Sequence, residues 1–313
     1  MSKFDDQFSL ESKTGAQLNV YYTKAKGKAH GIVHINHGLA EHALRYADFA
    51  HELGEARFHV YAHDHRGHGY TKSVDAPPGV FSLVGDGAKK ALEDCAEVQT
   101  HSQNKHPDKP LIMFGHSMGA ILTMNYVFRQ PANLAGAAVW NTNFDAGLLG
   151  RLAQLILRYE RFRLGSDMPS RILPKLTFDD WAKKIPNHRN NFDWLSRIES
   201  EVDAYVADPL CGWDPSVGMW RDIFGMVFAG SAPGKHASAD AKKRPIHFLG
   251  GGDDPSTNFG KAVANQAKRL SETGFTDVNS HIFPDARHET LNDLDAEEAT
   301  KRFIGFAKSC CSE

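Results

Sequence analysis

One serine of the chain stands in a context that is typical of a nucleophile. Ser117 is the central residue of a Gly-His-Ser-Met-Gly sequence at 115–119, a G-x-S-x-G pattern. An apolar segment of strand length precedes it at 111–114, and helix-forming residues follow at 120–126. In a strand-to-helix turn this tight, the serine takes strained backbone angles that leave its hydroxyl exposed above the sheet. A serine held in this way can attack a carbonyl carbon.

The same turn offers a means of stabilising the negative charge that such an attack creates. The backbone N–H of Met118 stands at the N-terminus of the following helix, where the helix dipole favours an anion. The glycines at both ends of the pattern fit this geometry, because a side chain there would strike the neighbouring strand or helix. A five-residue pattern with two free positions is a weak signal by itself. The rest of the chain must therefore supply a histidine, an acid and a second oxyanion donor.

The elements that would position these groups alternate between strands and helices. A hairpin is expected within 4–24, because apolar and polar residues alternate on either side of a Thr-Gly turn. Further strands are expected at 30–36, 58–62, 111–114, 134–140, 245–249 and 278–283, and helices at 46–53, 86–104, 118–130, 259–270 and 296–308. This order predicts an α/β fold in which a mostly parallel central sheet carries helices on both faces.

The alternation is interrupted by a long segment without a convincing strand. We therefore predict a core formed by 1–143 and 231–313, and a helical cap inserted at 144–230. One stripe of apolar residues marks the first part of this cap, with arginines beside it: Leu148, Leu152, Leu155, Ile156 and Tyr159. A helix packed on the core is the plainer interpretation of that stripe. We expect it instead to face an apolar pocket over Ser117 or a lipid surface.

Chemically useful residues follow four of the expected strands, at 37–39, 115–119, 251–255 and 286–289. Because the carboxyl ends of parallel strands meet at one edge of a sheet, these segments are expected to lie together. Along the chain they supply a serine, then an acid, then His288. This is the order in which α/β-hydrolases carry a Ser–acid–His triad.

At this point the chain resembles the α/β-hydrolase superfamily, and more closely its monoacylglycerol lipase and lysophospholipase branch. The resemblance covers about 30–145 and 235–305. It is carried by His37-Gly-Leu-Ala-Glu-His42 with Arg45-Tyr46, Asp64-His-Arg-Gly-His-Gly69, Gly115-His-Ser-Met-Gly119, Gly251-Gly-Asp-Asp-Pro255 and Ala286-Arg-His288. It implies hydrolysis of carboxylic esters of lipid-like or other small acyl groups, without a metal or an organic cofactor. The branch often has Val after Asp-Pro, whereas this chain has Ser256-Thr257, which can alter the loop.

The resemblance implies a role for each member of the site. Ser117 attacks the ester carbonyl with His288 as general base, and Asp254 orients the histidine. The N–H groups of Leu39 and Met118 hold the oxyanion. The candidates for lining the substrate pocket are His37, Gly38, His116, Leu148 and Leu152. His116, which stands beside the nucleophile, also fits a packing role.

The choice between two adjacent acids rests on the turn that presents them. Asp253 and Asp254 cannot both face His288, because neighbouring side chains leave a strand end in different directions. A glycine three residues before the acid, counted from Gly251, selects Asp254. Counting from Gly250 selects Asp253 instead, so this alternative stays open.

Parts of the sequence also fit functions other than ester hydrolysis. The H-x-H-x-x-H pattern at 63–68 invites a zinc site, but it has Gly67 where such hydrolases usually have an aspartate before the last histidine. A structural loop is the favoured interpretation. Aminopeptidase, thioesterase, C–C hydrolase or perhydrolase activity would use the same fold and triad. A catalytically inactive binding protein is a further alternative.

Composition excludes several other classes of protein. The chain has 313 residues and a net charge of −2, without the basic run that indicates nucleic-acid binding. Its four cysteines form neither a disulfide framework nor a zinc spacing, and no signal or membrane-spanning pattern is recognised. We therefore expect a cytoplasmic protein whose partner is a small acyl ester, with transient contact of the cap with a lipid surface. The oligomeric state is not predicted.

Overall fold

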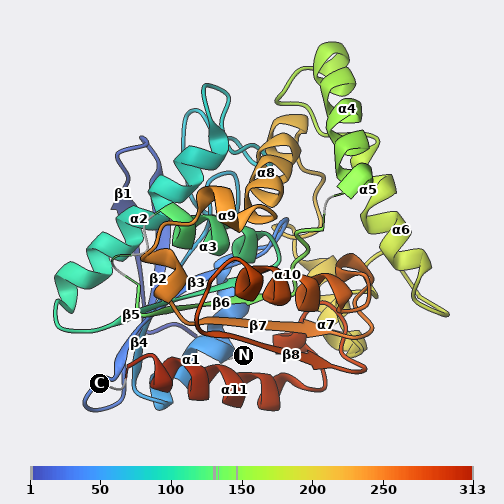
Figure 1. Cartoon of the computed structure of the whole chain (residues 1–313). Coiled ribbons are helices and arrows are strands. Elements are labelled where there is room, and N and C mark those ends of the chain that lie inside the picture. The colour runs from blue at the N-terminus through green and yellow to red at the C-terminus, as the bar shows by residue number, and fades with distance from the viewer. Residues whose placement is uncertain (1–2, 130–131, 133, 146, 312–313) are drawn as a thin grey trace.

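A single mixed sheet forms the centre of the computed structural model, which describes residues 3–129, 132, 134–145 and 147–311. Within these residues eight strands pair in the order β1-β2-β4-β3-β5-β6-β7-β8 (Figure 1). Pairing is antiparallel between β1, β2 and β4, and parallel from β4 to β8. The strands are β1 (Asp6–Glu11), β2 (Gln17–Thr23), β3 (Gly31–Asn36), β4 (Phe58–His63), β5 (Leu111–His116), β6 (Gly136–Trp140), β7 (Ile246–Gly251) and β8 (Val278–Phe283).

Burial of the strands follows from their place in the sheet. Every residue of β3, β5, β6 and β7 is buried, which explains why these central strands are almost continuously apolar. At the edge, β1 alternates between exposed and half-buried residues. The predicted α/β fold with a mostly parallel sheet is confirmed.

Helices cover both faces of the sheet. On one face α1 (Ala47–Glu55) and α11 (Ala296–Ser309) form an apolar cluster with the strands, in which Phe49 and Phe303 pack against Phe114. On the other face lie α2 (Gly87–Lys105), α3 (Met118–Arg129), α8 (Val217–Gly230) and α10 (Lys261–Glu272). The short 3₁₀ helices are η1 (Ala43–Tyr46), η3 (Ala241–Lys243), η4 (Pro255–Thr257) and η5 (Thr290–Asn292).

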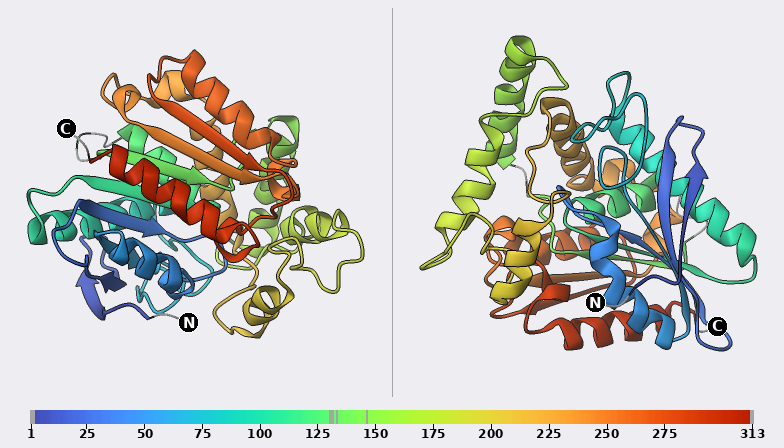
Figure 2. Two further views of the ribbon diagram at one scale, coloured as in Figure 1. Left: turned by 90° about the horizontal axis from the view of Figure 1, so that it is seen from below. Right: turned by 180° about the vertical axis from the view of Figure 1, so that it is seen from behind.

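The segment predicted as a cap is helical and stands to one side of the sheet (Figure 2). It contains α4 (Gly147–Leu164), α5 (Leu173–Leu176), α6 (Phe178–Lys183), α7 (Glu199–Ala207) and, at its end, α8. The short α9 (Pro233–His236) follows outside the segment. Its last helix differs from the others, because Met219 and Met226 of α8 belong to the same apolar cluster as α2 and α3. The segment at 144–230 therefore ends within the packing of the core. No described helix combines the length and the apolar composition that crossing a bilayer requires.

Candidate active site

The turn between β5 and α3 holds Ser117 in a left-handed conformation, with a φ of 53°. Ser117 is half-buried, whereas the residues on either side of it are buried. A Cβ atom at Gly119 would lie 2.1 Å from the carbonyl oxygen of Asn36, and one at Gly115 would lie 2.3 Å from that of Gly119. Glycine is therefore required at both positions. The close approach at Gly119 brings the N-terminus of α3 against the end of β3, where the loop that carries Leu39 begins.

The structure brings Asp254 to His288. Asp254 follows β7, and its Oδ2 accepts a hydrogen bond of 2.9 Å from Nδ1 of His288, which follows β8. Asp254 is fully buried and His288 is 4% exposed, whereas Asp253 is exposed. Burial by itself raises the pKa of Asp254, but the charge of His288 and hydrogen bonds from His288 and Ser256 lower it below its usual range. The buried acid is thus held as a carboxylate that orients the imidazole.

Ser256 is a member of this group that sequence reasoning did not assign. Its hydroxyl donates to Asp254 Oδ1 at 2.7 Å and lies 2.9 Å from His288 Nδ1. Its backbone N–H also donates to Asp254 Oδ1, at 2.9 Å. The signal was present, because a serine two residues after an aspartate commonly closes such a turn. The residue at which this chain departs from the related branch therefore contacts two members of the predicted triad.

The loop after β3 is held in place by a buried carboxylate. Glu41 accepts hydrogen bonds from the backbone N–H of Gly38 and, at 2.8 Å, from the hydroxyl of Tyr46. Ala40, next to Leu39, takes a left-handed conformation with a φ of 54°. Because Gly38 and Ala40 are fixed on either side, the backbone N–H of Leu39 has a defined direction.

Glu41 also belongs to a group of four charged side chains behind His288, of which Arg45 is half-buried and the other three are buried. Arg45 donates to both Glu41 and Glu289, at 2.6 Å in each case. Nε2 of His116 donates to the backbone carbonyl of His288 at 3.1 Å, while its Nδ1 lies 3.5 Å from Glu41. Burial opposes protonation of His116, but the hydrogen bond and charge of Glu41 raise its pKa above the usual range. Two carboxylates are thus balanced by a guanidinium and an imidazolium, and together they join the loop after β3 to the loop after β8.

Comparison with known proteins supports the same interpretation. Residues 27–295 match the family described as serine aminopeptidase, S33. The chain belongs to this family of α/β-hydrolases. The predicted family resemblance is thereby confirmed.

Two curated relatives of this hydrolase are lipases. It is 30% identical over 270 residues to a monoacylglycerol lipase of Mycolicibacterium smegmatis, covering 84% of this chain and 82% of the relative. It is 29% identical over 212 residues to the monoglyceride lipase of Mus musculus, covering 66% of this chain but only 61% of the mouse protein. Among solved structures, a thermostable carboxyl esterase from Bacillus coagulans superposes with a TM-score of 0.88 at 24% identity, and all of both chains is covered. At that identity, the likeness shows the fold alone.

The segment predicted as a cap contacts both loops of the site in this hydrolase. Trp194 packs against the His288 ring at a centroid distance of 4.8 Å, and its carbonyl accepts from the His288 N–H. On the other loop, the carbonyl of Ala40 accepts from the Tyr205 hydroxyl at 2.8 Å and from the Gly212 N–H at 2.9 Å. Leu39 packs against an apolar cluster formed by α4, α5 and α8. The segment predicted as a cap therefore packs against the loops that carry the predicted histidine and oxyanion donor.

The structure separates the five predicted pocket residues into two groups. The first group is buried beside the predicted triad and consists of His37, Gly38 and His116. Its hydrogen bonds are to the surrounding loops. For example, Nδ1 of His37 donates to the Gly38 carbonyl, and Nε2 of His37 accepts from the N–H of His65. Leu148 and Leu152 lie on the outer side of α4, where they are 80% and 52% exposed. They are not brought together with Ser117. Their exposure is what contact with a lipid surface would require, and it excludes these two leucines from the lining of an enclosed pocket.

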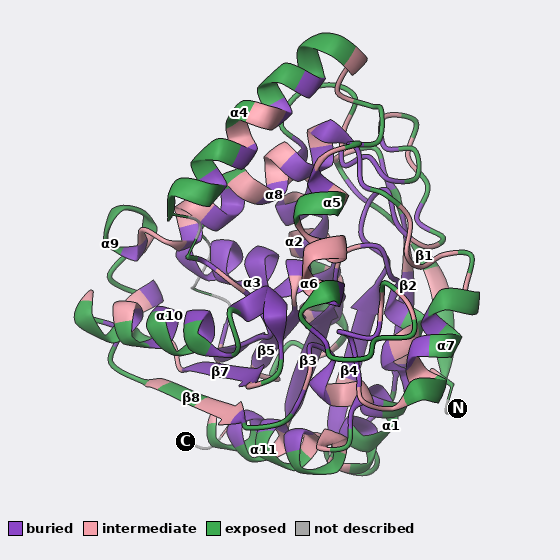
Figure 3. Cartoon of the chain, turned by 90° about the vertical axis from the view of Figure 1, so that its right-hand side faces the viewer, coloured by how far each residue is buried: buried purple, intermediate pink, exposed green. Residues whose placement is uncertain are grey.

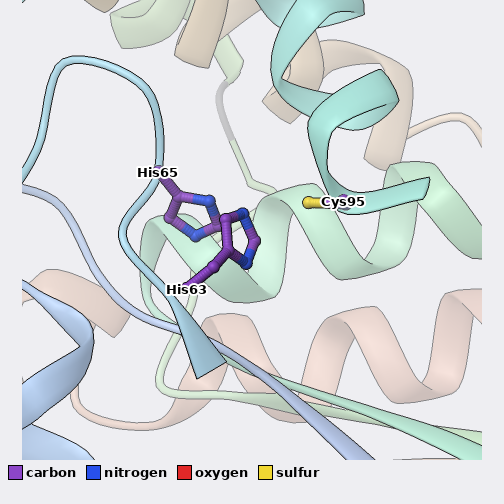
Figure 4. A group of neighbouring side chains, drawn as sticks. All are labelled: His63, His65 and Cys95. Carbon is purple, nitrogen blue, oxygen red and sulfur yellow. The ribbon is translucent and has the colours of Figure 1, made fainter. Parts of the chain in front are cut away.

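The histidines of the H-x-H-x-x-H pattern do not all lie together in the structure. His63 and His65 lie beside Cys95 of α2 (Figure 4), with ligating atoms within 4.8 Å of one another, and His68 is not among them. Burial raises the pKa of the Cys95 thiol, which donates to the Asn36 side chain, whereas zinc binds a thiolate. Burial also lowers the pKa of both imidazoles well below its usual range. We interpret the group as uncharged packing beneath the loop.

Proposed function

We propose that this chain is a carboxylic ester hydrolase that forms an acyl-enzyme on Ser117. The observation that carries the proposal is the hydrogen bond between His288 Nδ1 and Asp254, at the strand ends where Ser117 is held in a left-handed turn. A carboxylate on Nδ1 keeps the proton there, so that Nε2 is free to accept the serine proton.

In the proposed reaction Ser117 Oγ attacks the ester carbonyl carbon while its proton passes to Nε2 of His288. The oxyanion is held by the N–H groups of Leu39 and Met118, each contributing about 3 kcal/mol to transition-state stabilisation. The alcohol leaves with the proton from His288, and the acyl-enzyme remains. Water then attacks the acyl carbon with the same histidine as base, and the carboxylic acid is released.

The proposed substrates are lipid-like esters of the monoacylglycerol or lysophospholipid type. The names of the curated relatives support this class. A cavity of about 630 Å³ within the cap is lined in part by Leu164, Phe178 and Phe192, and its volume lies in the range of small-molecule sites. The cavity is also lined by Gly212, whose N–H is bonded to the Ala40 carbonyl beside the proposed oxyanion donor. We propose that it receives part of the substrate.

Contact of the cap with a lipid surface is a second part of the proposal. Much of α4 is exposed (Figure 3). Its exposed residues include six large apolar ones: Leu148, Leu149, Leu152, Leu155, Tyr159 and Phe162. A helix with one apolar exposed face and cationic neighbours is suited to lie in a membrane interface. Such contact would bring the cap cavity to the place where insoluble substrates are found.

Labelling with a fluorophosphonate probe tests the nucleophile directly. The wild-type protein should be labelled at Ser117 and should hydrolyse p-nitrophenyl esters, whereas Ser117→Ala should fold normally and lose activity by several orders of magnitude. If Ser117→Ala keeps more than about a tenth of the wild-type activity, the serine mechanism is wrong. A panel of monoacylglycerols and lysophospholipids then identifies the substrate class.

The family description favours one second candidate, an aminopeptidase. Both activities use the same triad, so the panel should include aminoacyl anilides beside the esters. A kcat/KM for an anilide above that for every ester would replace the esterase proposal with the aminopeptidase.

A further inference from the structure

A polar cavity of about 350 Å³ lies on the other side of α4 from its exposed apolar residues, between α4, the start of α8 and the loop before α2. Three arginines line it. Arg158 and Arg161 are one turn apart on α4, and Arg221 lies on α8, which packs beside α4 (Figure 3). None of the cavity's lining residues belongs to the predicted triad or to the oxyanion loop.

These three guanidinium groups lack the partners that other arginines of the chain have. Arg45 and Arg197, for example, each form ion pairs with two carboxylates. Within the described residues, no carboxylate forms an ion pair with Arg158, Arg161 or Arg221, and no hydrogen bond holds them. Arg158 and Arg161 are exposed and Arg221 is half-buried, so an anion from solution can reach all three guanidinium groups. Their like charges repel one another, and an anion bound among them would relieve that repulsion.

The nearest acid on α4 is turned away from the cavity. Glu160, between the two cavity arginines of α4 in sequence, is 3% exposed and accepts hydrogen bonds from the Ser170 hydroxyl and from the Arg171 N–H. Its charge is therefore used to hold the loop after α4. The arginines on the opposite side keep their positive charge unopposed.

The acid that lines the cavity is weakened by its surroundings. A carboxylate oxygen of Asp222 occupies the space beside Gly87, at the start of α2. Burial and the charge of Asp86 raise the pKa of Asp222 to about 7, against the effect of Arg221. Near neutral pH the Asp222 carboxyl is thus partly protonated and opposes an incoming anion less than a full negative charge would. Burial and the charges of Arg161 and Arg158 lower the pKa of Arg221, against the effect of Asp222.

We propose that this cavity binds a phosphate group. Guanidinium groups donate paired hydrogen bonds in a fixed plane that matches phosphate oxygens, and three of them can neutralise a dianion. The cavity volume lies in the range of small-molecule sites and leaves room for an organic group attached to the phosphate. The phosphate belongs either to a soluble phosphate or phosphomonoester, or to a phospholipid headgroup at the surface that α4 contacts. The site is separate from ester hydrolysis.

The test compares two double variants of the same helix. Arg158→Gln/Arg161→Gln removes two charges from the cavity, and Arg151→Gln/Arg163→Gln removes two charges from α4 outside it. Calorimetric titration with inorganic phosphate, with chloride at equal ionic strength as the blank, should show binding by wild type. The affinity should fall about tenfold or more in the cavity variant, because two of the three cations that line the cavity are removed, and should stay unchanged in the control variant. Hydrolysis of a p-nitrophenyl ester should be unchanged in both.

Vesicle flotation distinguishes the two sources of phosphate. Vesicles of phosphatidylcholine alone are compared with vesicles that also contain phosphatidylglycerol. Loss of vesicle binding in the cavity variant alone identifies a headgroup, whereas equal binding by both variants, together with the titration result, identifies a soluble phosphate. If wild type binds neither phosphate nor vesicles, or if the two variants lose affinity equally in both measurements, the site does not exist and the arginines act only as diffuse charge. Asp222→Asn should tighten phosphate binding above neutral pH, because the ionised carboxylate that faces Arg221 is removed.

Discussion

Replacing Asp254 with asparagine should inactivate the protein through a specific rearrangement of hydrogen bonds. Oδ1 of Asp254 accepts from the backbone N–H of Ser256 at 2.9 Å, and Oδ2 accepts from His288 Nδ1 at 2.9 Å. An amide at this position must turn its oxygen toward the Ser256 N–H, because the reverse orientation would set two donors against each other. The amide NH₂ then points at Nδ1 of His288 and forces the proton onto Nε2. An imidazole with this tautomer cannot accept the proton of Ser117.

The expected loss is about 10³–10⁴ in kcat, which corresponds to about 4–5.5 kcal/mol of transition-state stabilisation. Steady-state hydrolysis of a p-nitrophenyl ester measures it, and thermal unfolding checks that the variant folds. Asp253→Asn is the matched control, since Asp253 is the adjacent, exposed acid. A loss of less than about tenfold for Asp254→Asn, or an equal loss for Asp253→Asn, would refute the assignment of the orienting acid.

Three further outcomes are expected. Ser256→Ala removes a hydroxyl that contacts both Asp254 and His288, so kcat/KM for an ester should fall about threefold to tenfold, with little change in the melting temperature. A loss above about a hundredfold would mean that the loop after β7 has moved. Gly119→Ala would push the loop after β3 away from the start of α3, so it should lower the free energy of unfolding by about 1–3 kcal/mol and abolish most of the activity. Gly225→Ala is the control, because a Cβ there meets open space on α8, and it should raise the free energy of unfolding by about 0.5–1 kcal/mol. Burial lowers the pKa of His116, but Glu41 raises it further, so the pKa in the folded protein lies above the ordinary value of 6.5. The charged form of His116 therefore stabilises the folded state below pH 6.5, and this contribution is lost as the pH rises through the raised pKa. Urea unfolding should therefore show a larger difference between wild type and His116→Asn at about pH 6 than at about pH 9, and a pH-independent difference would contradict the charged state.

The elements that carry the chemistry could be predicted from the sequence because their causes are local. The turn at Ser117 needs glycine on both sides, and each glycine is where a Cβ would meet backbone atoms. The central strands are buried on both faces, so their apolar runs are visible in the sequence. The alternation of these strands with helices was enough to place the four candidate segments at one edge of the sheet. Turn spacing counted from Gly251, together with the family resemblance, favoured Asp254 over Asp253.

Contacts between distant segments were decided only by the tertiary structure. Arg45 and Glu289 are 244 positions apart, and nothing in the periodicity around either residue indicates the pair. The same holds for Ser256 against His288. The stripe on α4 shows why: its period predicts an amphipathic helix, but whether that face meets a pocket, a core or solvent depends on what the rest of the chain packs beside it. A sequence pattern records which residues share a face. Which partner that face receives is settled only when segments far apart in the chain compete for the same buried surface.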